Sequence, residues 1–167
     1  MATITLKGQP IHTSGELPAT GTKAPDFCLT ARDLSDKSLA DFAGWKKLMN
    51  IFPSVDTGVC AQSVREFYQR AVEQPNLAVL NISADLPFAH SRFCVAEGMA
   101  GMVPLSAMRS KDFGRDYGVL LQDGPLAGLL ARAVLVVDEQ DRVIYSELVP
   151  EVSQEPNYDA ALKAVRG

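Results

Sequence analysis

The sequence predicts an α/β fold with a central mixed β-sheet, and three observations lead to it. Short apolar runs alternate with segments of helical spacing through the middle of the chain, as in strands joined by crossover helices. Near the C-terminus two apolar runs flank a polar turn, which indicates an antiparallel hairpin beside the parallel strands. The 167 residues, of which 47% are hydrophobic, can bury a core without disulfide staples. We therefore expect a single domain over residues 1–167.

The first third of the chain predicts an N-terminal extension followed by strands. Residues 1–18 place two alternating segments around a turn at Gly8–Pro10, which is typical of a β-hairpin. Short strands are expected at Phe27–Thr30 and near Ser38. Lys46–Phe52 is an apolar run followed by a polar loop, and it predicts a buried strand.

The middle of the chain predicts a strand between two helices. Residues 60–74 place apolar side chains at helical spacing, and residues 77–84 are apolar enough for a central strand. The second helix is expected over residues 85–98, with Asp85 near the N-cap and Gly98 at the C-terminal stop. A strand, a helix and another strand in this order form a parallel crossover.

The last third predicts a shorter helix, a hairpin and a closing helix. These are expected at residues 113–119, at 131–149 around the turn Asp138–Asp141, and at 155–167. The complete order of elements is that of a thioredoxin-like fold, a central mixed β-sheet flanked by helices, with a β-hairpin extension at its N-terminus.

Composition and charge argue against several classes of partner. The net charge is −4 and Lys46-Lys47 is the only adjacent basic pair, so no basic patch for nucleic acid is expected. No apolar run approaches the roughly 20 residues that span a bilayer, and the N-terminus does not resemble a secretory signal. We therefore expect a cytoplasmic protein. Its three cysteines, an odd number, do not suit a disulfide-stapled secreted domain.

Cys60 is expected in the first turn of a helix that begins near Gly58. The unpaired N–H groups and partial positive charge of a helix N-terminus favour the reactive thiolate, although the dipole supplies only about 0.3–1 kcal/mol. An acidic thiol would need a further positive charge, such as an arginine. Thr57 could cap the helix and place its hydroxyl beside the sulfur, and Pro53 ends the preceding strand. A small buried core residue is the alternative interpretation of Cys60.

Four segments of the sequence together resemble one enzyme family. Pro53, Thr57 and Cys60 form a Pro-x-x-x-Thr-x-x-Cys pattern that resembles the active-site motif of peroxiredoxins. The segments "KAPDF", "FPSVDTGVCAQSVREF", "ISADLPFAHSRFC" and "DGPLAGLLARAVLVVDE" occur in family-like order and spacing along nearly the whole chain. They resemble the bacterial thiol peroxidases, the atypical two-cysteine branch of the peroxiredoxins.

The resemblance implies a role for each matching residue. Cys60 takes the place of the peroxidatic cysteine, which attacks a hydroperoxide and becomes a sulfenic acid. Thr57 would hydrogen-bond the thiolate and the peroxide, and Pro53 would shield the pocket from water. Arg132 matches the arginine that stabilises the thiolate and the leaving oxygen. A surface position on its strand is the alternative for Arg132. Cys94 matches the resolving cysteine, so the family implies a Cys60–Cys94 disulfide.

The resemblance also implies partners and substrates. They are thioredoxin as the reductant, hydrogen peroxide and alkyl hydroperoxides as substrates, and a second copy of the chain in a homodimer. No cofactor and no metal are implied. Phe88, Leu126 and Leu129 are apolar residues expected near the pocket, and they hint at organic hydroperoxides.

Other interpretations of the same residues remain open. Cys94 could simply pack against the sheet. His90 and Cys94 are also four residues apart on one helix, so both could reach a metal ion, but the sequence offers too few further ligands for a zinc site. We expect His90 to be solvated and Cys28 to be a buried structural cysteine. A general disulfide oxidoreductase would carry a second cysteine where Ser63 stands. A redox sensor or binding module, switched by the same disulfide, is the non-enzymatic alternative.

Overall fold

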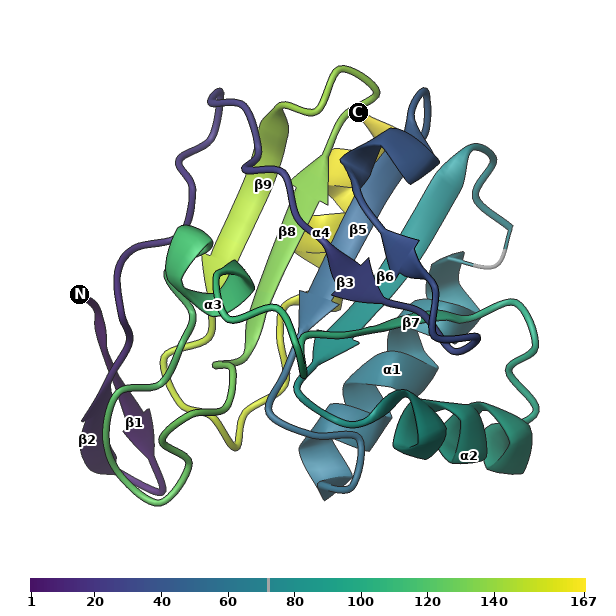
Figure 1. Cartoon of the computed structure of the whole chain (residues 1–167). Helices are drawn as coiled ribbons and strands as arrows, with labels where there is room; N and C mark the ends of the chain where they lie inside the picture. The colour runs from purple at the N-terminus through teal and green to yellow at the C-terminus, as the bar shows by residue number, and fades with distance from the viewer. Residues whose placement is uncertain (72) are drawn as a thin grey trace.

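The computed structural model describes residues 1–71 and 73–167, so Val72, which the sequence assigns to a helix, lies outside the described residues. A seven-stranded sheet forms the centre of the molecule, and a separate two-stranded hairpin lies beside it (Figure 1). The elements are β1 (Thr3–Leu6), β2 (Gln9–His12), β3 (Leu29–Thr30), β4 (Asp36–Lys37), a 3₁₀ helix (Leu39–Phe42), β5 (Lys46–Ile51), α1 (Gly58–Ala71), β6 (Leu77–Ser83), α2 (Pro87–Glu97), β7 (Val103–Ser106), α3 (Phe113–Asp116), β8 (Ala133–Val137), β9 (Val143–Leu148) and α4 (Tyr158–Arg166).

The central sheet is mixed, as the sequence predicts. Its strand order is β4-β3-β7-β6-β5-β8-β9. β5, β6 and β7 pair in parallel, whereas the β3–β4, β3–β7, β5–β8 and β8–β9 pairs are antiparallel. The segments that follow β5 and β6 therefore leave the sheet at the same edge, and each leads into a helix that carries a cysteine.

Side chains alternate across the central strands, so each face of the sheet has its own apolar core. On one face Leu48 and Val134 pack with residues of α1 and α4. On the other face Met49 and Leu135 join a larger cluster that includes Phe113 of α3. A third cluster joins α1 to α2 and contains both Cys60 and Cys94.

The N-terminal hairpin is confirmed, but its turn lies earlier than the sequence predicts. Lys7 and Gly8 form the turn, with φ angles of 50° and 81° that suit a tight hairpin connection. Pro10 is instead inside β2, opposite Thr5. The hairpin is attached to the segment between β9 and α4. The Thr5 N–H donates to the Pro150 carbonyl at 2.8 Å, and the Thr5 carbonyl accepts from the Val152 N–H at 2.9 Å.

Two elements differ from the sequence prediction. The strand expected near Ser38 is at Asp36–Lys37, and the residues after Ser38 form a 3₁₀ helix. β7 is not evident from the sequence, because it is four residues long and contains Pro104, which cannot donate to a strand ladder. The proline is tolerated because β3 reaches only Ser106 of this strand. Among the described residues, no helix is long and apolar enough to cross a bilayer.

A buried ion pair fastens the sheet at the end remote from α1. The Lys47 side chain is fully buried at the start of β5, and its Nζ lies 2.5 Å from Asp141 Oδ1 and 3.3 Å from the Asp138 carbonyl. This pair connects β5 to the turn between β8 and β9. The predicted turn at Asp138–Asp141 is confirmed.

Candidate active site

Cys60 lies in the first turn of α1, as the sequence predicts, and its side chain is fully buried. Because α1 begins at Gly58, the sulfur is close to the unpaired N–H groups of the helix N-terminus. The residue packs in the apolar cluster between α1 and α2. Burial raises the free-energy cost of forming the thiolate, so a desolvated thiolate needs a direct partner in addition to the helix terminus.

Arg132, the residue immediately before β8, is that partner. Its Nη2 donates to Cys60 Sγ at 3.1 Å, and its Nε donates to the Val152 carbonyl at 2.8 Å. Only 2% of its surface is exposed, so the surface position considered above is wrong. Nη1 is buried without a hydrogen-bond partner among the described residues. The guanidinium thus has one donor on the sulfur and a second available to another acceptor.

Pro53 and Thr57 occupy the loop between β5 and α1. Pro53 is buried, and both residues line a cavity beside Arg132. The Thr57 hydroxyl donates to the Ser54 carbonyl at 3.1 Å. The expected bond from this hydroxyl to the sulfur is therefore not formed here, and Thr57 is exposed at the cavity wall.

The cavity has a volume of about 680 Å³ and a mostly apolar wall. The N-terminal hairpin forms one side of it, the start of α1 a second, and the loop before β8 a third. Leu126 lines the cavity as expected, but Leu129 does not, and Phe88 is 65% exposed on α2. The lining residues are Leu6, Lys7, Gln9, Ile11, Pro53, Thr57, Gly58, Val59, Pro125, Leu126, Arg132, Val152 and Ser153.

Cys94 lies on α2 and is 2% exposed. Its Sγ lies 3.6 Å from Met102 Sδ, within the same apolar cluster as Cys60. Burial raises the pKa of the Cys94 thiol, and the positive charge of Arg32 opposes this in part. Both cysteines are free thiols in this structure.

Two expectations about polar residues are wrong. His90 is not solvated: it is 1% exposed, and its Nε2 lies 2.8 Å from Ser83 Oγ. Cys28 is exposed rather than buried: it lies just before β3, between Phe27 and Leu29, whose side chains are both buried. In the described part of the chain, no three His, Cys, Asp or Glu side chains are grouped to hold a metal ion.

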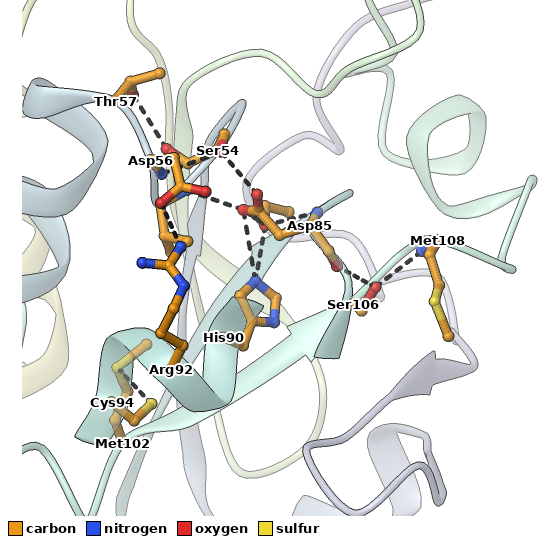
Figure 2. Close-up of polar contacts among 12 residues, drawn as sticks. Ser54, Asp56, Thr57, Asp85, His90, Arg92, Cys94, Met102, Ser106 and Met108 are labelled. Atoms are coloured by element: carbon orange, nitrogen blue, oxygen red, sulfur yellow. Dashed lines mark hydrogen bonds and ion pairs between the residues drawn. The ribbon is translucent and has the colours of Figure 1, made fainter. Parts of the chain in front are cut away.

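Asp85 was expected to cap α2, but it binds the loop before α1 instead. Its carboxylate accepts hydrogen bonds from Ser54 Oγ and from the Val55 N–H (Figure 2). Leu86 occupies the N-cap position. A signal for this contact exists in the sequence, since Ser54 and Asp85 each follow one of two adjacent parallel strands and so reach the same sheet edge.

Comparison with known proteins places the chain in a family. The redoxin family model matches residues 19–162. A thiol peroxidase of Mycobacterium bovis is 56% identical over 165 residues, which are 99% of each chain. This chain belongs to the thiol peroxidase family. It is therefore an enzyme of the peroxiredoxin type.

Solved structures agree with the thiol peroxidase assignment and confirm the predicted thioredoxin-like fold. A peroxiredoxin-like protein from Aquifex aeolicus superposes with a TM-score of 0.93 and 34% identity, over 99% of this chain and 96% of that one. A thiol peroxidase from Chromobacterium violaceum gives a TM-score of 0.92 and 26% identity over the same shares of the two chains.

Proposed function

We propose that this thiol peroxidase reduces hydroperoxides at Cys60 and regenerates the thiol through a Cys60–Cys94 disulfide. The observation that carries the proposal is the Arg132 guanidinium, which donates to Cys60 Sγ at 3.1 Å and keeps a second donor free of partners among the described residues. A thiolate and a peroxide oxygen are the two acceptors that such a fork can hold side by side.

The first step is nucleophilic. The Cys60 thiolate attacks one peroxide oxygen, an S–O bond forms, and the O–O bond breaks. The other oxygen leaves with the bonding electron pair and takes up a proton to become water or an alcohol. The sulfur is thereby oxidised by two electrons to a sulfenic acid. Arg132 stabilises the thiolate before the step and the charge on the leaving oxygen during it, while Pro53 keeps water from the buried sulfur.

The second step joins the two cysteines. The Cys94 sulfur attacks the Cys60 sulfenic acid, a disulfide forms, and the hydroxyl leaves as water. Both residues belong to one apolar cluster, which supports the pairing. However, both thiols are buried on separate helices, so the segments must move before the sulfurs reach bonding distance. A dithiol reductant then returns both thiols by supplying two electrons, and we propose thioredoxin for this role.

The cavity supports organic hydroperoxides as well as hydrogen peroxide as substrates. Its apolar wall extends from Arg132 to Leu126 and Ile11, and can bury an alkyl chain while the peroxide group reaches the guanidinium.

We further propose a homodimer, because Leu86 and Phe88 expose 54% and 65% of their surfaces beside the active-site loop. Light scattering that gives the monomer mass at micromolar concentration would refute the dimer.

Substitution of each cysteine tests the catalytic proposal. Cys60→Ser should abolish peroxide consumption, and unchanged consumption in this variant would refute the role of Cys60. Cys94→Ser should leave the first turnover intact, accumulate the sulfenic acid, and stop recycling by thioredoxin. Mass spectrometry after one equivalent of peroxide should find a Cys60–Cys94 linkage in the parent protein and in Cys28→Ser, the matched control.

A further inference from the structure

The two segments that carry the cysteines are joined at one buried carboxylate (Figure 2). Asp85 lies between β6 and α2, the helix of Cys94. Its Oδ1 accepts from Ser54 Oγ at 2.7 Å and its Oδ2 from the Val55 N–H at 2.9 Å. Ser54 and Val55 belong to the loop that leads into α1 and Cys60. We call these bonds, together with Ser83 and His90, the Asp85 clasp.

The clasp satisfies a carboxylate that has little access to solvent. The Asp85 side chain is 10% exposed, so its charge depends on the hydrogen bonds it accepts. Ser83 Oγ supplies a third bond to Oδ2 at 2.5 Å. The backbone of Asp85 is also held, since Ser106 Oγ donates to its carbonyl at 2.6 Å. Asp85 is therefore fixed to the sheet, and the loop is fixed to Asp85.

His90 supports the clasp from within α2. The single hydroxyl proton of Ser83 is given to Asp85, so Ser83 Oγ must accept from His90 Nε2, which is 2.8 Å away. His90 therefore carries a proton on Nε2. Burial lowers the pKa of His90, which agrees with a neutral ring, and its buried Nδ1 has no partner among the described residues.

The clasp is better protected from solvent than the ion pair that also connects the Cys60 loop to α2. This ion pair joins Arg92 to Asp56 at 2.7 Å, and the two side chains are 63% and 58% exposed. Exposed pairs of this kind contribute little to a conformational equilibrium, whereas bonds to a buried carboxylate are costly to break. Of these two links, the bonds of Asp85 therefore contribute more to holding the Cys60 loop closed.

We propose that Asp85 is a positioning residue that holds the Cys60 loop closed on Arg132, and that release of its bonds limits disulfide formation. The inference rests on the proposed role of Cys94. In the closed arrangement Cys60 meets Arg132 and is ready for peroxide, but both cysteines are buried on separate helices. The disulfide therefore forms from a minor open state, whose population falls as the clasp becomes stronger.

The test follows the two steps separately in a single turnover. Reduced protein is mixed rapidly with hydrogen peroxide, quenched with an alkylating agent, and analysed by mass spectrometry for thiol, sulfenic acid and disulfide. Asp85→Asn keeps the size of the side chain but replaces one acceptor oxygen by a donor, so at least one bond of the clasp is lost. We expect disulfide formation about tenfold faster, as for one lost charge-assisted hydrogen bond, and peroxide attack changed by less than about twofold. At high peroxide the fraction of sulfinic acid should fall, because the sulfenic acid is shorter-lived.

Three further variants make the outcome decisive. Ser54→Ala removes one bond of the clasp and should accelerate disulfide formation in the same direction but less, which keeps the test open if Asp85→Asn folds poorly. Asn157→Ala removes the N-cap bond of α4, far from the clasp, and should leave both rates unchanged while lowering stability. Cys94→Ser should abolish the disulfide; if it does not, the proposed function fails independently of the clasp.

Either of two results would refute the proposal that the Asp85 clasp limits disulfide formation. One is disulfide formation in both clasp variants that is no faster than in the parent protein, while Cys94→Ser blocks it. The other is an equal acceleration in Asn157→Ala, which would attribute the effect to general loss of stability.

Discussion

Arg132 Nη2 lies 3.1 Å from Cys60 Sγ, and Arg132 Nε donates to the Val152 carbonyl at 2.8 Å. The carbonyl holds the plane of the guanidinium against the sulfur, so the orientation of the cation does not depend on Cys60 alone. Val152 is itself bonded through its N–H to Thr5 of the N-terminal hairpin. The hairpin therefore contributes to the position of the arginine.

Replacement of this arginine tests its geometry rather than its charge. Arg132→Lys keeps a positive charge but cannot bond the sulfur, Val152 and a peroxide oxygen together. We expect the rate constant for peroxide reduction to fall about 100-fold, the typical effect of removing a donor that stabilises a developing oxyanion. Stopped-flow kinetics measures it. Arg142→Lys, an exposed arginine at the β8–β9 turn, is the matched control, and an equal loss in both variants would contradict the assignment.

The thiols should differ in their reactivity toward an alkylating agent. Cys28 is exposed, whereas Cys94 is buried and burial raises the pKa of its thiol. In the reduced native protein we expect iodoacetamide to label Cys28 well before Cys94, as measured by peptide mass spectrometry over time. The difference should vanish in denaturant. Equal labelling rates in the native protein would mean that α2 opens freely without peroxide.

The cavity should govern the choice among hydroperoxides. Leu126→Trp places a larger side chain on the apolar wall, so we expect the KM for cumene hydroperoxide to rise several-fold, while the rate with hydrogen peroxide stays within about twofold. Steady-state kinetics with both substrates measures the ratio. Leu34→Trp, at an exposed position remote from the cavity, is the control. A parallel loss with both peroxides would show that the wall does not select substrates.

Glu151 should make the attachment of the hairpin depend on pH. Hydrogen bonds, first from the Ser153 side chain and then from the Ser153 and Gly8 N–H groups, lower the pKa of Glu151 from 4.5 to about 2. Because the folded-state pKa is the lower one, the unfolded chain binds more protons between these values. The stabilisation is therefore complete above pH 4.5 and is lost as the pH falls toward 2.

Urea unfolding of Glu151→Gln tests whether this stabilisation is lost as the pH falls. We expect the variant to be less stable than the parent at pH 7, and the gap to narrow markedly at pH 3. Glu139→Gln, at an exposed site in the β8–β9 turn, should show no such trend. A gap for Glu151→Gln that is as wide at pH 3 as at pH 7 would show that its charge is not what holds the hairpin.

Local patterns in the sequence predicted most of the fold and the surroundings of Cys60. The strand Lys46–Ile51 is an apolar run and the helix Gly58–Ala71 has apolar residues at helical spacing, and both have clear boundaries. β7 lacks both signals, because it is short and Pro104 interrupts it. Its presence depends on pairing with β6, a contact that local patterns do not encode.

The polar residues were harder to predict because their burial depends on partners remote in the chain. His90 has the local pattern of a surface helix residue, yet Ser83 provides a bond that allows its burial. Asp85 has the local pattern of a helix cap, yet Ser54 and Val55 compete for its carboxylate. Cys28 was assigned by residue type alone, yet it lies just before β3 and is exposed. Arg132, in contrast, was identified by its match to the active-site arginine of the family, and the need of an acidic thiol for a positive charge agrees with it.

The buried Lys47–Asp141 pair divides the central sheet into two ends with different freedom. Lys47 lies near the start of β5 and Asp141 lies in the turn between β8 and β9, whereas Cys60 and Arg132 meet beyond the other end of the same strands. The catalytic end can therefore open and close in each turnover while the Lys47 end stays protected from solvent. In hydrogen–deuterium exchange, amides of β5 and β8 near Lys47 should be the last to exchange, whichever oxidation state the cysteines adopt.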